Sequence, residues 1–139
     1  MASNVNGKNR RIKGGFLMIP HEVLRSPAYR SLSPSAVKLL VDIAGQYNGK
    51  NNGDLTACMA LMKPRGWRST STLNRAKREL LSGGLIEQTR QGGMNLGPNL
   101  YAITWKPIDE CTDKKGRPRH DATPTTKPSG LWKQPRVAA

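Results

Sequence analysis

The chain of 139 residues is short of cysteine, of acidic residues and of long hydrophobic runs. Its two cysteines, Cys58 and Cys111, are too few and too far apart for a disulfide framework or a zinc site, so we expect free thiols. No window approaches the roughly 18 apolar residues of a membrane-spanning helix. The sequence therefore predicts neither a disulfide-stapled scaffold nor a membrane span.

Enzyme signatures are also scarce. The sequence has no Walker-type Gly-Lys-Ser/Thr loop, no HExxH motif and no nucleophile elbow. The acidic residues of the central region include Asp42, Asp54, Glu79 and Glu87. They are spread over predicted helix, loop and strand, unlike a clustered nuclease site. His21 and His120 lack partners at metal-site or triad spacing, which favours structural or surface roles. We expect a non-enzymatic protein without cofactor or metal.

Positive charge is abundant instead. There are 23 Lys and Arg against 9 Asp and Glu, which gives a formal net charge of +14 at pH 7. This imbalance causes self-repulsion unless a polyanion relieves it, so nucleic acid is the leading partner class and a membrane surface its competitor. The polar, basic N-terminal residues contain no apolar segment of a signal peptide. We expect a cytoplasmic, nucleoid-associated protein without membrane contact.

Composition divides the chain into three parts. Residues 1–15 hold four basic residues and no acid and predict a flexible basic arm, with Arg10 and Arg11 as candidate DNA contacts. Residues 16–107 hold twelve basic and five acidic residues and predict one folded domain. Residues 108–139 are rich in Pro, Thr, Lys and Arg and predict a basic disordered tail. Leu131-Trp132 is a candidate docking segment for a protein partner.

Hydrophobic periodicity and capping residues predict an α+β domain. The expected elements are an edge strand over 16–19, two helical turns within 21–32, helices over 34–44, 57–62 and 70–82, and strands over 85–91 and 100–106. Pro27 separates the two turns. Ser33, Thr56 and Ser69 are expected N-caps, and Gly83-Gly84 a left-handed C-terminal cap. Three helices followed by a hairpin in this order predict a winged helix.

The strongest functional signal is the helix expected over residues 70–82. Its apolar residues fall on one face at helical spacing, while Asn74, Arg75 and Arg78 project elsewhere. An amphipathic helix with a basic, amide-bearing face suits the DNA major groove. Six basic residues and no acid lie between Lys63 and Arg78, inclusive. This pattern predicts a DNA-recognition helix that runs into a wing.

The candidate DNA contacts combine base-reading and phosphate-binding side chains. In the domain they are Arg65, Arg68, Ser69, Ser71, Thr72, Asn74, Arg75, Arg78, Arg90 and Asn95. Arginine can read guanine, asparagine adenine, and hydroxyls can hold phosphate. Arg65 and Arg68 flank the turn before the helix, where backbone amides also bind phosphate. Arg90, Met94 and Asn95 belong to the wing, which approaches the backbone or minor groove. The alternatives are a solvated basic helix and an ordinary hairpin turn.

Three aromatic residues allow more than one interpretation. Trp67 either stacks on a sugar or base, or packs in the core with its indole N–H bonded locally, and we favour the core role. Tyr101 and Trp105 alternate with Ile103 along the last strand. We expect them in the core or on a dimer surface rather than in a base-stacking platform.

Six segments carry a family resemblance: GFLMIP (15–20), SPAYRSLS (26–33), QYNGKNNGDL (46–55), RGW (65–67), GLIEQTRQGG (84–93) and LYAITW (100–105). Together they resemble the small winged helix-turn-helix proteins of bacterial prophages, plasmids and integrative elements, over residues 15–109. The resemblance implies a winged-helix fold and DNA binding by a regulator or replication-associated protein, without naming a target. Pro64 and the wing tip over 94–98 depart from the commoner pattern.

Three functional hypotheses follow. The first is sequence-specific binding of double-stranded DNA, as a homodimer on a palindromic site, by a regulator or repressor of a bacterial mobile element. The second is a non-enzymatic adaptor of a nucleoprotein complex, such as a plasmid or phage replication accessory or an RNA–protein effector complex, which the long tail favours. The third is nonspecific DNA condensation driven by charge.

Overall fold

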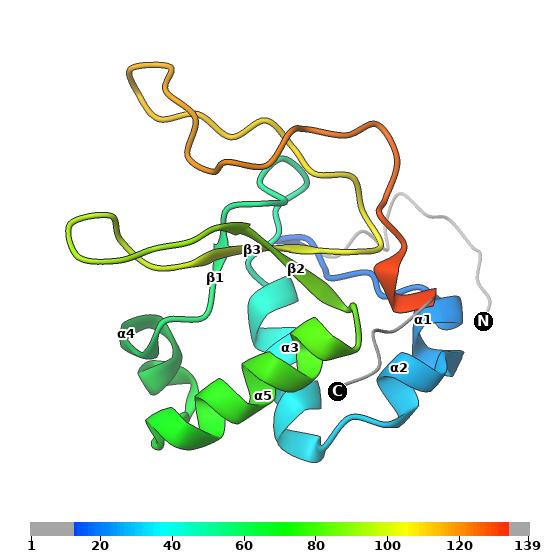
Figure 1. The fold of residues 1–139 in the computed structure, drawn as a ribbon. Coiled ribbons are helices and arrows are strands. Elements are labelled where there is room, and N and C mark those ends of the chain that lie inside the picture. The colour runs from blue at the N-terminus through cyan, green and yellow to red at the C-terminus, as the bar shows by residue number, and fades with distance from the viewer. Residues whose placement is uncertain (1–12, 134–139) are drawn as a thin grey trace.

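The computed structural model describes residues 13–133 and has an α+β architecture (Figure 1). In chain order the elements are α1 (His21–Arg25), α2 (Pro27–Arg30), α3 (Pro34–Ala44), β1 (Leu55–Thr56), α4 (Met59–Met62), the 3-10 turn η2 (Lys63–Arg65), α5 (Thr70–Ser82), β2 (Ile86–Arg90), β3 (Leu100–Ile103) and the 3-10 turn η3 (Leu131–Lys133). The strands form an antiparallel sheet in the order β1-β3-β2. Helices α3 and α5 lie on one side of this sheet, and the chain after β3 crosses the other side (Figure 1).

Local capping sets the bounds of the two long helices. The hydroxyl oxygen of Ser33 accepts a 3.2 Å hydrogen bond from the N–H of Ala36, and Pro34 occupies the first turn of α3. Ser69 caps α5 in the same way, by accepting a 3.2 Å hydrogen bond from the N–H of Thr72. Both predicted helices are confirmed. They were predictable because each contains its own start signal in the sequence.

The end of α5 also follows the prediction. Gly84 has a φ of +72°, and its N–H donates to the carbonyl of Leu81 at 3.1 Å. The N–H of Leu85 reaches back to the carbonyl of Leu80 at 3.0 Å, which completes a left-handed glycine cap. This cap turns the chain from α5 directly into β2. It thereby fixes the β2–β3 hairpin close to the helix.

Two predicted features near the sheet are wrong. No strand forms over residues 16–19; instead, the carbonyl of Met18 accepts a 3.2 Å hydrogen bond from the indole N–H of Trp105. Thr56 is not a helix N-cap, because it pairs with Leu100 as part of β1. Helix α4 begins later, after Cys58, without a side-chain cap. The edge of β3 that β2 does not cover provides the backbone partner for Thr56. Local sequence signals do not reveal this partner.

A buried asparagine joins the loop after α3 to the end of β3. Asn52 is fully buried, and its Oδ1 accepts a 2.8 Å hydrogen bond from the N–H of Ile103. Its Nδ2 lies within 3.0 Å of the carbonyl oxygens of Ile103, Lys106 and Pro107. Buried amides must be bonded in this way to avoid a desolvation penalty. Asn52 therefore holds the start of β1 beside β3.

Residues 108–133 differ from the predicted disordered tail. Ile108, Cys111, His120 and Trp132 are buried, and Trp132 belongs to the main hydrophobic core. The Nε2 of His120 lies 2.8 Å from the carbonyl oxygen of Asp109, so this histidine has a structural role. The composition of residues 108–133 is polar overall, but these four side chains are nevertheless buried. The packed domain therefore extends beyond residue 107.

Candidate nucleic-acid interface

The turn before α5 is held against α3 by a shared carboxylate. Oδ2 of Asp42 accepts 2.8 Å hydrogen bonds from the indole N–H of Trp67 and from Nζ of Lys38. Lys38 also donates to the carbonyl of Arg65 at 2.8 Å, and its Nζ lies 5.5 Å from the centroid of the Trp67 ring. Trp67 is buried, which confirms its predicted core role. The start of α5 is thus fixed relative to α3.

The one acidic residue of α5, Glu79, is half-buried against the start of α3. The carboxylate of Glu79 accepts hydrogen bonds from the backbone N–H of Ser33 at 2.9 Å and from its hydroxyl at 2.7 Å. Negative charge is favourable at this position, because the N-terminus of α3 carries a partial positive charge. Glu79 therefore binds α3, and the opposite side of α5 carries no acid.

Four of the exposed residues of α5 form what we call the α5 face: Ser71, Asn74, Arg75 and Arg78. Their spacing repeats at three and four residues, which places them on one side of a helix. The buried residues of α5 point the other way and are Leu73, Ala76 and Leu80. The α5 face combines two guanidinium groups, an amide and a hydroxyl. These groups can donate to the acceptor edges of bases or to phosphate oxygens.

Two predicted contacts on α5 do not join this face. Ser69 uses its hydroxyl as the N-cap, and its Oγ also lies 3.0 Å from Oγ of Ser71. Thr72 is half-buried and lines a hollow beside α3, with Pro34 and Lys38. Both residues support the start of the helix. Helical geometry explains this, because Thr72 lies next to Ser71 in sequence but about 100° away around the axis.

Arg65 and Arg68 lie on the turn that leads into α5, and both are exposed. Nη1 of Arg65 is 3.8 Å from Oδ1 of Asp42, which is a long distance for an ion pair. The side chain of Arg65 is 48% exposed. Such an ion pair contributes little and leaves the guanidinium accessible to other anions. The turn therefore adds positive charge at the N-terminal end of α5.

Lys77 is a basic residue near this surface that the predicted contacts omit. It lines a hollow between α5 and the β2–β3 hairpin, together with Cys58, Gly92 and Asn99. Burial lowers the pKa of Lys77, with a smaller opposing effect from Cys58. Its position four residues after Leu73 is the sequence signal for a side chain at the edge of the apolar face.

Arg90 is half-buried at the end of β2, where the loop of the β2–β3 hairpin begins. Its Nη1 donates to the carbonyl of Arg119 at 3.1 Å, and its Nη2 donates to the carbonyl of Pro98 at 3.0 Å. The guanidinium thus joins the hairpin to the chain after β3. The sequence contained no signal for this role, because Arg119 is far away along the chain.

The hairpin tip is exposed and partly apolar. Asn95 has a φ of +66°, a left-handed conformation that asparagine tolerates better than most residues. Met94 and Leu96 flank it and are 90% and 63% exposed. A bridge between Gly93 and Gly97 closes the loop, which extends away from the sheet (Figure 1).

The remaining predicted residues are two aromatics, two cysteines and the two arginines of the basic arm. Tyr101 and Trp105 are buried, as the core interpretation predicted. Cys58 and Cys111 are free thiols, which confirms that prediction. Arg10 and Arg11 lie outside the described residues. Within residues 13–133, no group of three or more His, Cys, Asp or Glu side chains could hold a metal ion, and no helix is both long and apolar enough to cross a membrane.

Comparison with known proteins finds no matching family model, and no curated protein or solved structure is significantly similar to this chain.

Proposed function

We propose that the protein is a winged-helix protein that binds double-stranded DNA sequence-specifically through the α5 face. The order of elements from α3 to β3 and the strand order β1-β3-β2 are compatible with this fold. In this proposal α4 and α5 form the helix-turn-helix pair, and the β2–β3 hairpin is the wing. The observation that carries the proposal is the exposed, acid-free α5 face.

Base reading is assigned to Asn74, Arg75 and Arg78. A major groove about 12 Å wide admits an α-helix, and side chains on its outer face then reach the base edges. Arginine can bind guanine, and asparagine adenine, through paired hydrogen bonds. The anchoring of α5 through Trp67 and Asp42 supports this assignment, because bidentate contacts need a rigidly positioned helix.

Phosphate binding is assigned to the basic groups around the helix. Arg65, Arg68 and Ser71 lie near the N-terminal end of α5, and Lys77 lies between α5 and the wing. Each neutralised phosphate releases counterions, so the affinity for DNA should fall steeply as salt rises. The basic arm with Arg10 and Arg11 is expected to add sequence-independent contacts. In this proposal the binding of DNA is non-enzymatic and needs no cofactor.

The biological role we propose is regulation of genes on a bacterial mobile element, which the family resemblance favours. A homodimer on a palindromic site would match the two-fold symmetry of its target. The test is selection from a random duplex library with the full chain at about 150 mM salt. A recurrent palindromic motif supports the dimeric regulator. Retained binding without any motif contradicts sequence-specific reading and favours charge-driven condensation.

Two features bear on the adaptor hypothesis, the burial of Trp132 and the exposed tip of the β2–β3 hairpin. Trp132, the centre of the expected docking segment, is buried in the domain's own core. Met94 and Leu96 instead offer an exposed apolar tip of the kind that protein partners bury. The variant Met94→Ser/Leu96→Ser separates the two functions. A DNA regulator should still select its motif with this variant, whereas an adaptor that docks through the tip should lose its complex.

A further inference from the structure

The chain after β3 forms a second hairpin beside the β2–β3 hairpin. The N–H of Arg119 donates to the carbonyl of Cys111 at 2.8 Å, and Thr112 pairs with Pro118 in an antiparallel bridge. We call residues 111–119 the tail hairpin. It extends toward the same side of the molecule as the β2–β3 loop (Figure 1). Two projecting loops therefore lie on the side where α4 also lies.

The turn of the tail hairpin is held by Asp113. Its Oδ1 accepts hydrogen bonds from the N–H groups of Lys115 and Arg117 at 2.8 and 3.0 Å, and its Oδ2 accepts one from Nε of Arg117 at 2.9 Å. The backbone hydrogen bond from Arg117 is the largest cause that lowers the pKa of Asp113. Gly116 provides the left-handed residue of the turn, with a φ of +80°. The carboxylate is thus occupied within the turn itself.

The two lysines at the tip have no such partner. Lys114 and Lys115 are exposed, and within residues 13–133 no carboxylate lies within ion-pair distance of either ammonium group. The exposed acids Glu110 and Asp121 lie at the base of the hairpin in sequence, outside its turn. Unpaired positive charge is therefore concentrated at the tip.

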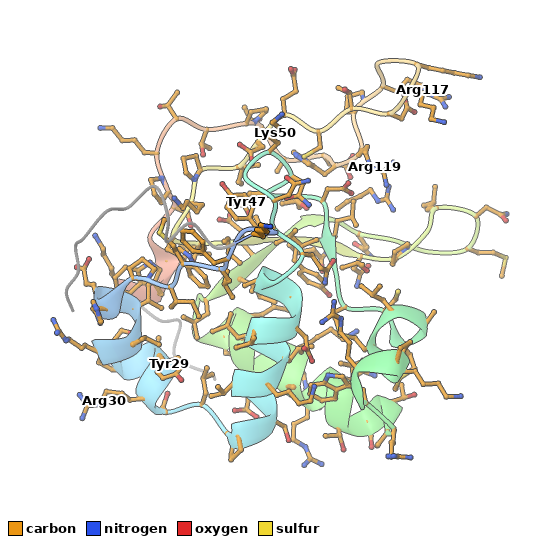
Figure 2. All side chains as sticks on the ribbon, turned by 180° about the vertical axis from the view of Figure 1, so that it is seen from behind. Tyr29, Arg30, Tyr47, Lys50, Arg117 and Arg119 are labelled. Atoms are coloured by element: carbon orange, nitrogen blue, oxygen red, sulfur yellow. The ribbon has the colours of Figure 1, made fainter. Side chains whose placement is uncertain are left out.

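The base of the tail hairpin is fixed to the sheet. Nε of Arg119 donates to Oδ2 of Asp54 at 2.8 Å, next to β1. Arg90 then bridges the two hairpins through the carbonyls of Arg119 and Pro98. Figure 2 shows Arg119 near the base of the tail hairpin and Arg117 toward its outer end. The lysine tip and the β2–β3 hairpin are thus held at a set spacing.

We propose that Lys114 and Lys115 bind the sugar-phosphate backbone of the same duplex that α5 reads, beyond the β2–β3 hairpin. This inference rests on the proposed DNA binding and extends it to a second contact region on the DNA. Backbone contacts of this kind position a protein on DNA without reading sequence. In this arrangement Arg90 holds the tail hairpin beside the β2–β3 hairpin.

The test compares two variants with the same loss of charge. Lys114→Gln/Lys115→Gln removes the tip lysines, and Lys50→Gln/Lys127→Gln removes two other exposed lysines as the control. The full chain is titrated with a mixed-sequence duplex of about 30 bp, which is about three helical turns, at several salt concentrations. The slope of log affinity against log salt should become shallower by about 1.8 for the tip variant, at about 0.9 for each lost phosphate contact. The control should keep the wild-type slope.

The outcomes separate the inference from the proposed function. If the wild-type chain binds the duplex and the tip variant keeps its slope, the tail hairpin does not bind DNA, whereas the role of α5 stands. Equal changes in both variants would also overturn the inference, because the effect would then follow net charge alone. Failure of the wild-type chain to bind any duplex would remove the proposed function itself.

Lysine acetylation gives a second readout that needs no substitution. Mass spectrometry of the wild-type chain should show several-fold slower acetylation of Lys114 and Lys115 when the 30 bp duplex is present. Lys127 should react at the same rate with and without DNA. Unprotected tip lysines on a chain that is otherwise saturated with duplex would contradict the proposed contact.

Discussion

The indole nitrogen of Trp67 and the Nζ of Lys38 both bind Oδ2 of Asp42, each at 2.8 Å. Trp67 and Asp42 are 5% and 9% exposed, so their hydrogen bond is shielded from water and strengthened by its surroundings. Asp42 belongs to α3, and Trp67 precedes α5. The contact therefore couples the core helix to the start of the proposed recognition helix.

The first prediction concerns this hydrogen bond. Trp67→Phe keeps an aromatic ring but removes the donor, and the unfolding free energy should fall by about 1–2 kcal/mol because a buried carboxylate loses a partner. Urea denaturation measures the change. Trp105→Phe is the control, since it loses only a 3.2 Å bond to the carbonyl of Met18 and should cost less. A larger loss for the control would contradict the anchoring role of Asp42.

The second prediction concerns the α5 face. Asn74→Ala and Arg75→Ala should each reduce the discrimination between the selected duplex and a random duplex by about 1–3 kcal/mol, because each would lose a bidentate base contact. Competition binding at fixed salt measures this difference. Arg25→Ala removes an exposed arginine from α1 and should leave discrimination unchanged. Equal losses on both duplexes for the α5 variants would assign them to phosphate binding alone.

The third prediction concerns the packing of the tail end. Gly84 and Gly49 both have positive φ, but only at Gly84 would a Cβ atom collide with the backbone of Leu131. Gly49→Ala should cost about 1–2 kcal/mol from backbone strain, and Gly84→Ala at least about 3 kcal/mol because overpacking is added. Thermal or urea unfolding of the full chain measures both. Equal costs would mean that η3 does not pack against Gly84 in solution.

The fourth prediction concerns thiol reactivity. Burial is the largest cause that raises the pKa of Cys111 to about 11, with Asp54 and Asp109 adding to it. At pH 8 only about one thiol in a thousand is then ionised, so Cys111 should react slowly with iodoacetamide. Its alkylation rate, followed by mass spectrometry, should rise about tenfold per pH unit up to pH 10. A rate that levels off below pH 9 would contradict the buried position.

The candidate site was predictable where it depended on one helix. Asn74, Arg75 and Arg78 were expected on the outer side of α5, and their exposure follows from helical spacing alone. The position of Lys77 beside the hairpin and the bridge made by Arg90 were not predictable in this way. Both depend on segments that meet only after the chain has folded.

The two long helices and the glycine cap after α5 follow from signals in the local sequence. Ser33, Pro34, Ser69 and Gly84 each act on backbone groups within a few residues, so their effects are encoded locally. Three other features arise only in the folded chain. The pairing of Thr56 with Leu100, the burial of Trp132 and the ordered tail hairpin all need partners far away in sequence. Such contacts form only when the core has brought both partners together, so neither composition nor periodicity reveals them.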